Sequence, residues 1–186
     1  MSDVKSKSVF SVRTISFCAV SSAVMCILGP MSIPIGTIPV SFTNLVIYAS
    51  LFVTGKRRTT LSVIIYLLLG IFGLPVFSGY SGGFGKLMGP TGGYLIGFVF
   101  LAYIGGAFIE KSNGSKVISF IGLVLGTAAT YLFGTAWFVI SMDCTWVYAF
   151  AVCVLPFIVI DIVKIILALI AGPAVRKRLD NANVDK

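Results

Sequence analysis

The chain has 186 residues, of which 58% are apolar and 11% are charged, and its formal net charge is +8. Its mean hydropathy is +1.04, so it has too little polar surface to cover a water-soluble globule. The composition therefore excludes an ordinary soluble domain and predicts an integral membrane protein.

Apolar runs follow one another along the chain, and we expect them to form a bundle of six transmembrane helices in an all-α integral membrane protein. They cover residues 14–30, 38–54, 59–73, 91–109, 117–140 and 147–172. The third run is short, so it either extends through Pro75 to Phe77 or does not cross completely. We expect a single domain over residues 1–186, with tails at residues 1–12 and 173–186.

Lysine and arginine gather in alternate connections between the runs. The N-terminal tail, the second and fourth loops and the C-terminal tail contain Lys5, Lys7, Arg13, Lys56, Arg57, Arg58, Lys111, Lys116, Arg176, Lys177, Arg178 and Lys186. The first, third and fifth loops contain only Lys86. By the positive-inside rule, both termini lie in the cytoplasm. Because the cations are dispersed at helix ends, the net charge is a topology signal and we expect no nucleic-acid binding.

Pairs of small residues four positions apart occur in two of the predicted helices. Ala19 and Ala23 share one face of the first helix, and Gly122 and Gly126 share one face of the fifth. Such faces allow another helix to approach closely. We expect the glycine pair to pack within this chain.

Two outer loops have unusual compositions. Residues 31–39 are uncharged and contain prolines, which predicts a stiff connector. Residues 74–90 are rich in glycine, so their backbone can fold tightly over a ligand, and we hypothesise that this segment is a lid. Gly85 and Lys86 do not complete a phosphate loop, because Leu87 stands where serine or threonine is required. Uphill transport would therefore need a separate ATPase subunit or an ion gradient.

Asp161 and Lys164 form the most informative pair, because they interrupt the otherwise apolar sixth run. Their spacing of three places both side chains on one face of a helix. A charge at the centre of a membrane helix costs about 2.5 to 3.5 kcal/mol on insertion scales, so retained charges usually face a polar cavity or a partner. This helix is therefore the first candidate for a binding site, and a structural ion pair is the alternative.

The chain offers few residues for metal or covalent chemistry. It contains no histidine, and its cysteines form no Cys-x-x-Cys pair. We therefore expect no metal site, no cofactor and no catalytic residues, and we interpret the cysteines as apolar packing residues. They are Cys18, Cys26, Cys144 and Cys153.

Several segments together resemble the BioY family, the biotin-specific substrate-binding (S) components of energy-coupling factor (ECF) transporters. They are Ile38–Asn44, Tyr66 with Gly70–Phe77, Gly89–Leu95, and Pro156–Phe157 followed by Asp161 and Lys164. The resemblance covers most of residues 13–172. It implies a six-helix S component in the bacterial cell membrane that captures biotin from outside. It also implies a transmembrane coupling subunit and two cytoplasmic ATPases as partners, with Ala19 and Ala23 against the coupling subunit.

The chemistry of biotin suggests roles for the polar candidates. Its ureido group offers two N–H donors and one carbonyl, and its tail carries a carboxylate. Given the resemblance, we expect Asp161 to accept a ureido N–H and Asn44 or Thr43 to satisfy the remaining ureido groups. Lys164 would donate to the ureido oxygen or to the carboxylate. Asn44 stands where the family often has glutamine, and its shorter amide reaches less far.

The fused rings of biotin need apolar walls, and aromatic side chains pack well on such rings. The candidates for these walls are Phe77, Tyr94, Tyr148 and Phe157. Lys86 either clamps the carboxylate or lies exposed to solvent.

Other functions were compared with this hypothesis. An S component for another small vitamin would have the same architecture. A small channel is suggested by Thr91–Tyr94, but a selectivity filter needs rings of oxygens around an axis. An intramembrane enzyme would need a catalytic constellation that the sequence does not provide.

Overall fold

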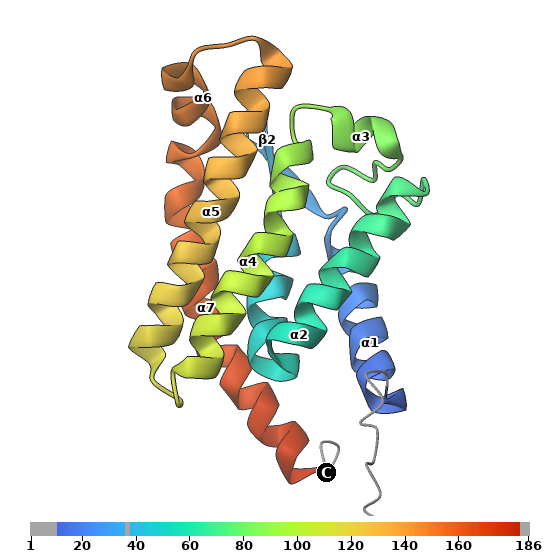
Figure 1. Cartoon of the computed structure of the whole chain (residues 1–186), viewed down its shortest axis with the longest axis vertical. Coiled ribbons are helices and arrows are strands. Elements are labelled where there is room, and N and C mark those ends of the chain that lie inside the picture. The colour runs from blue at the N-terminus through green and yellow to red at the C-terminus, as the bar shows by residue number, and fades with distance from the viewer. Residues whose placement is uncertain (1–10, 36–37, 183–186) are drawn as a thin grey trace, which may run out of the picture.

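The computed structural model describes residues 11–35 and 38–182, so residues 1–10 with Lys5 and Lys7, and Lys186, lie outside the described part. The described residues form helices and one short hairpin (Figure 1). In chain order the elements are α1 (Val12–Leu28), β1 (Ser32–Ile35), β2 (Ile38–Ser41), α2 (Thr43–Ile71), α3 (Phe84–Met88), α4 (Gly92–Lys111), α5 (Lys116–Met142), α6 (Trp146–Cys153) and α7 (Leu155–Asn181).

The second and third apolar runs are the two arms of α2, which bends sharply at Gly55. This residue has φ 80° and ψ 173°, a conformation that glycine adopts without steric cost. The arms cover residues 43–54 and 56–71 and diverge from the bend in Figure 1. The second arm ends at Ile71, so of the two alternatives for the third run, the extension through Pro75 to Phe77 is wrong.

Within the described residues, three helical segments are long and apolar enough to cross a membrane: Gly92–Lys111, Lys116–Met142 and Trp146–Asn181. The last combines α6 and α7, whose helical path is interrupted at Val154, shortly before Pro156. Proline has no N–H to continue the ladder of a preceding helix, so a break is expected there. α7 then continues past the expected end at residue 172, through Pro173, to Asn181.

The first outer loop differs from the expected connector, because β1 and β2 pair as an antiparallel hairpin. Ser32 lies opposite Ser41, and Pro34 lies opposite Pro39. Prolines are tolerated here because each strand of a two-stranded ribbon has an unpaired edge. The molecule is therefore a helical bundle with a short β-hairpin at one end.

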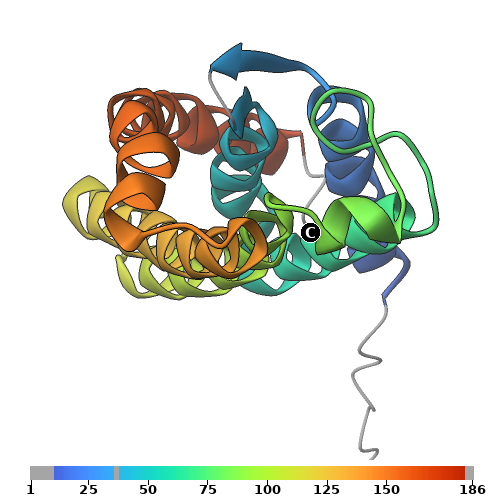
Figure 2. The same cartoon turned by 90° about the horizontal axis from the view of Figure 1, so that it is seen from above.

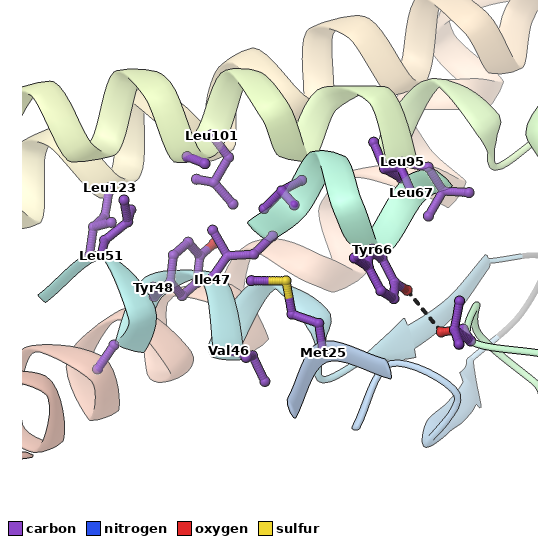
Figure 3. Packing of buried hydrophobic residues seen from close by; sticks show 14 of the residues in the cluster. Met25, Val46, Ile47, Tyr48, Leu51, Tyr66, Leu67, Leu95, Leu101 and Leu123 are labelled. Carbon is purple, nitrogen blue, oxygen red and sulfur yellow. Dashed lines mark hydrogen bonds between the residues drawn. The ribbon is translucent and has the colours of Figure 1, made fainter. Parts of the chain in front are cut away.

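The helices form two layers. Figure 2 shows α7, the first arm of α2 and α1 in one layer, and α5, α4 and the second arm of α2 in the other. Their common core contains fully buried side chains from both arms of α2 and from α1, α4 and α5 (Figure 3). They include Met25, Ile47, Tyr48, Leu51, Tyr66, Leu101 and Leu123.

The two glycines of α5 pack against α4, as expected. A Cβ atom on Gly122 would lie 2.1 Å from Cβ of Phe108, and one on Gly126 would lie 2.9 Å from Cδ1 of Leu101. No larger side chain fits without displacing α4. The pair is therefore an internal packing surface.

The basic segments gather at one end of the bundle. The start of α1, the bend of α2, the α4–α5 connection and the end of α7 all lie at the lower end in Figure 1. The hairpin, α3 and the α5–α6 connection lie at the upper end. We call these the basic end and the hairpin end. Their separation agrees with the expected topology, and the cytoplasmic location of the basic end stays a prediction.

Candidate functional site

Asp161 and Lys164 lie on the face of α7 that packs inside the molecule, with exposed fractions of only 5% and 6%. Nζ of Lys164 is 3.2 Å from Oδ1 of Asp161. Both charges are therefore withdrawn from lipid and paired, as a charge at this depth requires.

Asn44, at the start of α2, bridges the two charges. Its Nδ2 donates to Oδ1 of Asp161 at 2.6 Å, and its Oδ1 accepts from Nζ of Lys164 at 2.9 Å. The backbone carbonyl of Ser41, at the end of β2, accepts from the same ammonium at 2.8 Å. With Asp161, the ammonium thus has three acceptors for its three N–H groups, which satisfies it completely.

Tyr131 of α5 completes this group, and the sequence analysis did not identify it. Its hydroxyl donates to Oδ2 of Asp161 at 2.5 Å. A carboxylate has about four lone-pair sites, and three are now occupied, so one acceptor site remains on Oδ2. The available signal was a tyrosine inside an apolar run, since a buried tyrosine hydroxyl needs a partner. We call Asn44, Tyr131, Asp161 and Lys164, with the carbonyl of Ser41, the polar cluster.

A cavity borders the polar cluster, and its other walls are mainly apolar. It is lined by Pro39, Val40, Ser41, Asn44, Tyr48, Tyr94, Phe98, Leu101, Thr127, Thr130, Tyr131, Cys153, Phe157, Asp161 and Lys164. Its volume of about 70 Å³ is well below the ~300 to 1,000 Å³ of pockets that hold drug-sized ligands. The cavity in this structure is therefore smaller than such a ligand requires.

A second small cavity, of about 60 Å³, continues toward the glycine-rich loop. It shares four lining residues with the first, namely Pro39, Ser41, Tyr94 and Phe98. Lys86, Phe77, Ser78 and Thr91 also line it. The two cavities together trace a path from the hairpin end of the bundle to the polar cluster.

The structure divides the predicted site residues into two groups. Asn44, Tyr94, Phe157, Asp161 and Lys164 line the main cavity, and Phe77 and Lys86 line the second. These seven residues therefore border the same pair of cavities, and their contact with a ligand stays a prediction.

Thr43 and Tyr148 lie apart from both cavities, and their contact with a ligand stays a prediction. Thr43 is 1% exposed and lines neither cavity; its hydroxyl accepts from that of Ser41 at 3.3 Å. It directly precedes Asn44 in α2, so it points about 100° away around the helix. Tyr148 is 52% exposed on α6 and lines neither cavity, because Ala149 and Cys153 form the buried face of that short helix.

The glycine-rich loop is attached firmly to the second arm of α2. Phe77 is fully buried, and its ring meets Tyr66 edge to face with centroids 5.6 Å apart. A Cβ atom on Gly70 would lie 2.0 Å from Cζ of Phe77, so only glycine leaves room for this ring. The carbonyl of Gly70 also accepts from the N–H of Gly83 at 2.7 Å. The part of this loop that lies over the second cavity is thus held at both ends, and its closure as a lid stays a prediction.

Ala19 and Ala23 lie on the exposed face of α1. The opposite face packs against α2, where the hydroxyl of Ser22 donates to the carbonyl of Ser62 at 3.0 Å. The alanine pair is therefore available to a partner, and its role at an interface stays a prediction.

Comparison with known proteins gives consistent matches over nearly the whole chain. Residues 3–181 match the model of the BioY family. The biotin transporter BioY2 of Lactococcus lactis is 31% identical over 91% of this chain and 93% of its own length. The biotin transporter BioY of Thermotoga maritima is 35% identical over 79% of this chain and 86% of its own length.

A solved structure matches as well. It is a 2.1 Å crystal structure of the S-component for biotin from an ECF-type ABC transporter, and it superposes with a TM-score of 0.82. It is 29% identical to this chain, and the match covers 89% of this chain and 92% of that one. The helical bundle with its hairpin is thus the fold of an ECF S component. Together, the matched family model and the curated relatives show that this chain belongs to the BioY family.

Proposed function

We propose that this protein is the biotin-binding S component of an ECF-type vitamin uptake transporter, and that it captures biotin with high affinity. The observation that carries the proposal is the polar cluster beside an apolar cavity, because biotin likewise joins a polar ureido group to apolar rings. Membership of the BioY family and the fold of a biotin S component support the same conclusion.

The unused hydrogen-bonding positions of the polar cluster match a ureido group. Oδ2 of Asp161 has one acceptor site left, and it takes a ureido N–H. Asn44 uses one N–H of its amide on Asp161 and offers the second to the ureido carbonyl. Lys164 has three acceptors already, so it contacts biotin only by releasing one of them. Lys164 therefore orients the cluster in the free protein and exchanges one acceptor when biotin binds.

Binding widens the cavity. A volume of about 70 Å³ does not hold a bicyclic ligand, so the hairpin moves away from the firmly held glycine-rich loop to admit the rings. Tyr94 and Phe157 then pack on the fused rings. The carboxylate tail extends into the second cavity, where Lys86 and the hydroxyl groups of Ser78 and Thr91 are available.

Biotin enters at the hairpin end, from outside a bacterial cell, and both termini lie in the cytoplasm. The protein lies in the cell membrane and binds biotin without chemical turnover. Transport is driven by two cytoplasmic ATPases acting through a transmembrane coupling subunit, which docks on α1 at Ala19 and Ala23. The exposure of this face supports the docking site.

Calorimetric titration of the purified chain tests the ligand. We expect one biotin per chain, with no comparable heat from a panel of other vitamins. Asp161→Asn removes an acceptor that the proposal requires and should weaken binding at least tenfold, whereas Asp143→Asn, in the α5–α6 connection, is the matched control. Tight binding of another vitamin would transfer the proposal to that ligand, and unchanged affinity in Asp161→Asn would overturn the assigned site.

Co-purification with the coupling subunit tests the partner. We expect Ala19→Leu combined with Ala23→Leu to abolish association and to leave biotin binding intact. Ala151→Leu, on the exposed face of α6, is the control and should preserve both. Loss of biotin binding together with association would show that the double variant is misfolded.

A further inference from the structure

The seam between α5 and α7 carries two cavities on its outer side. One lies at the basic end, has a volume of about 350 Å³, and is lined by polar and apolar residues. The other lies further along the same two helices, has a volume of about 370 Å³, and is almost entirely apolar. We call them the basic cavity and the apolar groove. Neither is part of the path to the polar cluster, although the groove reaches the outer side of Tyr131 and Asp161.

The basic cavity is suited to an anion. Its lining contains three cations, Lys116, Arg176 and Lys177, and one acid, Asp180. Arg176 holds Asp180 at 3.1 Å and donates to the carbonyl of Val53 at 2.8 Å, so this pair is part of the cavity wall. The exposed ammonium groups of Lys116 and Lys177 supply the remaining positive charge. Lys116 also begins α5, where the helix dipole adds positive potential.

The apolar groove has the dimensions of a lipid chain. Its α5 wall runs from Phe120 to Tyr131, which lie four and fifteen residues after Lys116. At 1.5 Å per residue, the groove extends from about 6 to about 22 Å beyond Lys116. The hydrocarbon core of one leaflet is about 15 Å thick. A chain anchored at Lys116 would therefore lie along this wall.

We propose that one anionic phospholipid occupies the seam. Its phosphate lies between Lys116 and Lys177, and one acyl chain fills the apolar groove against Phe120, Val124 and Ile162. A free phosphate would use only the basic cavity, and a neutral lipid only the groove. The anionic lipid satisfies both features at once, and basic pockets between membrane helices are known to bind such headgroups. The acyl chain also covers the Tyr131–Asp161 bond from outside. The inference is independent of which ligand the polar cluster binds.

Native mass spectrometry of the intact chain with added phosphatidylglycerol or phosphatidylcholine tests the proposal. The wild type should retain one phosphatidylglycerol in preference to phosphatidylcholine. Lys116→Gln combined with Lys177→Gln should weaken this binding about 30-fold, since each surface cation contributes about fivefold. Lys111→Gln combined with Arg178→Gln removes the same charge from the same end, outside the cavity, and should weaken it less than threefold.

Two further arms separate the alternatives. Ala128→Trp places an indole in the groove and should also reduce phosphatidylglycerol binding, whereas glycerol 3-phosphate should not compete with the lipid. Equal losses in the two charge variants would show that the lipid is attracted by the overall positive charge of this end, and would overturn the proposal. Competition by glycerol 3-phosphate, or full retention of lipid in Ala128→Trp, would overturn the seating of the acyl chain. Thermal unfolding of each variant confirms that it is folded.

Discussion

The two faces of α5 are built on opposite principles. Toward α4, Gly122 and Gly126 bring the helices so close that a Cβ atom on either would collide with its neighbour. Toward α7, the apolar groove remains open, and the hydrogen bond between Tyr131 and Asp161 connects the two helices beside it. One helix therefore takes part in a tight interface and a loose one.

The difference shows where the bundle can adapt. Close packing over small residues resists displacement, because every neighbour is already at contact distance. A seam joined by polar side chains can exchange one hydrogen-bond partner for another without opening a void. The cavity beside the polar cluster is lined in part by the hairpin, α6 and α7. If a ligand enters it, we expect these elements to move while α4 and α5 stay together.

The largest effect should come from removing the charge of Lys164, which lies on α7 beside the loose interface with α5. Lys164→Met leaves Asp161 buried without its counter-charge, which costs about 3 to 5 kcal/mol in comparable pairs. We expect a strongly lowered melting temperature in detergent and no measurable biotin binding by calorimetry. Combining it with Asp161→Asn should recover most of the stability but none of the binding. If the double variant is as unstable as the single one, the cost does not come from the unpaired charge.

The next largest effect should come from the hydrogen bond between Tyr131 and Asp161. Tyr131→Phe deletes one hydrogen bond to a charged group, worth about 1.5 to 3 kcal/mol, and keeps the aromatic wall. We expect weaker biotin affinity, measured by titration, and a moderate loss of stability. Tyr103→Phe, at a 58% exposed position of α4, is the matched control and should change neither. Wild-type behaviour of Tyr131→Phe would show that the seam does not depend on this bond.

A pair of leucine substitutions compares the two faces directly. Gly122→Leu overpacks the tight interface and should destabilise the protein by about 1 to 3 kcal/mol. Ala128→Leu places the same side chain on the groove side of the same helix, and its effect should be within about 0.5 kcal/mol. Thermal unfolding in one detergent gives the comparison. Similar losses for both would mean that the two faces are equally constrained.

The smallest effect is expected at Tyr148, which lies on α6 and belongs to neither interface of α5. Its side chain is half exposed on α6, so Tyr148→Ala should change biotin affinity less than twofold. Phe157→Ala, in the wall of the main cavity, is the positive control and should weaken binding clearly. A loss of affinity in Tyr148→Ala would return this residue to the site.

Sequence reasoning found the two charges because a charge inside an apolar run is costly wherever the run folds. Only the structure distinguished Asn44 from Thr43. Neighbouring side chains at the start of a helix point in different directions, and the packing of the helix decides which of them faces the cavity. Tyr131 and the Ser41 carbonyl were missed for a similar reason. Their roles depend on which helix and which strand lie beside α7. The prolines of the first loop predicted a stiff connector, but they did not reveal the pairing of β1 with β2.

The carbonyl of Ser41 connects the hairpin to Lys164 in a way that has a thermodynamic consequence. If a ligand oxygen replaces the Ser41 carbonyl as an acceptor of the Lys164 ammonium, the hairpin loses its hydrogen bond to Lys164. Conversely, if the hairpin moves away, the ammonium loses an acceptor. Occupancy and hairpin position are therefore coupled. This coupling is reciprocal. If ligand binding favours movement of the hairpin, a partner that moves the hairpin changes the ligand's binding free energy by the same amount. A single backbone oxygen thereby links the position of the hairpin to the affinity of the site.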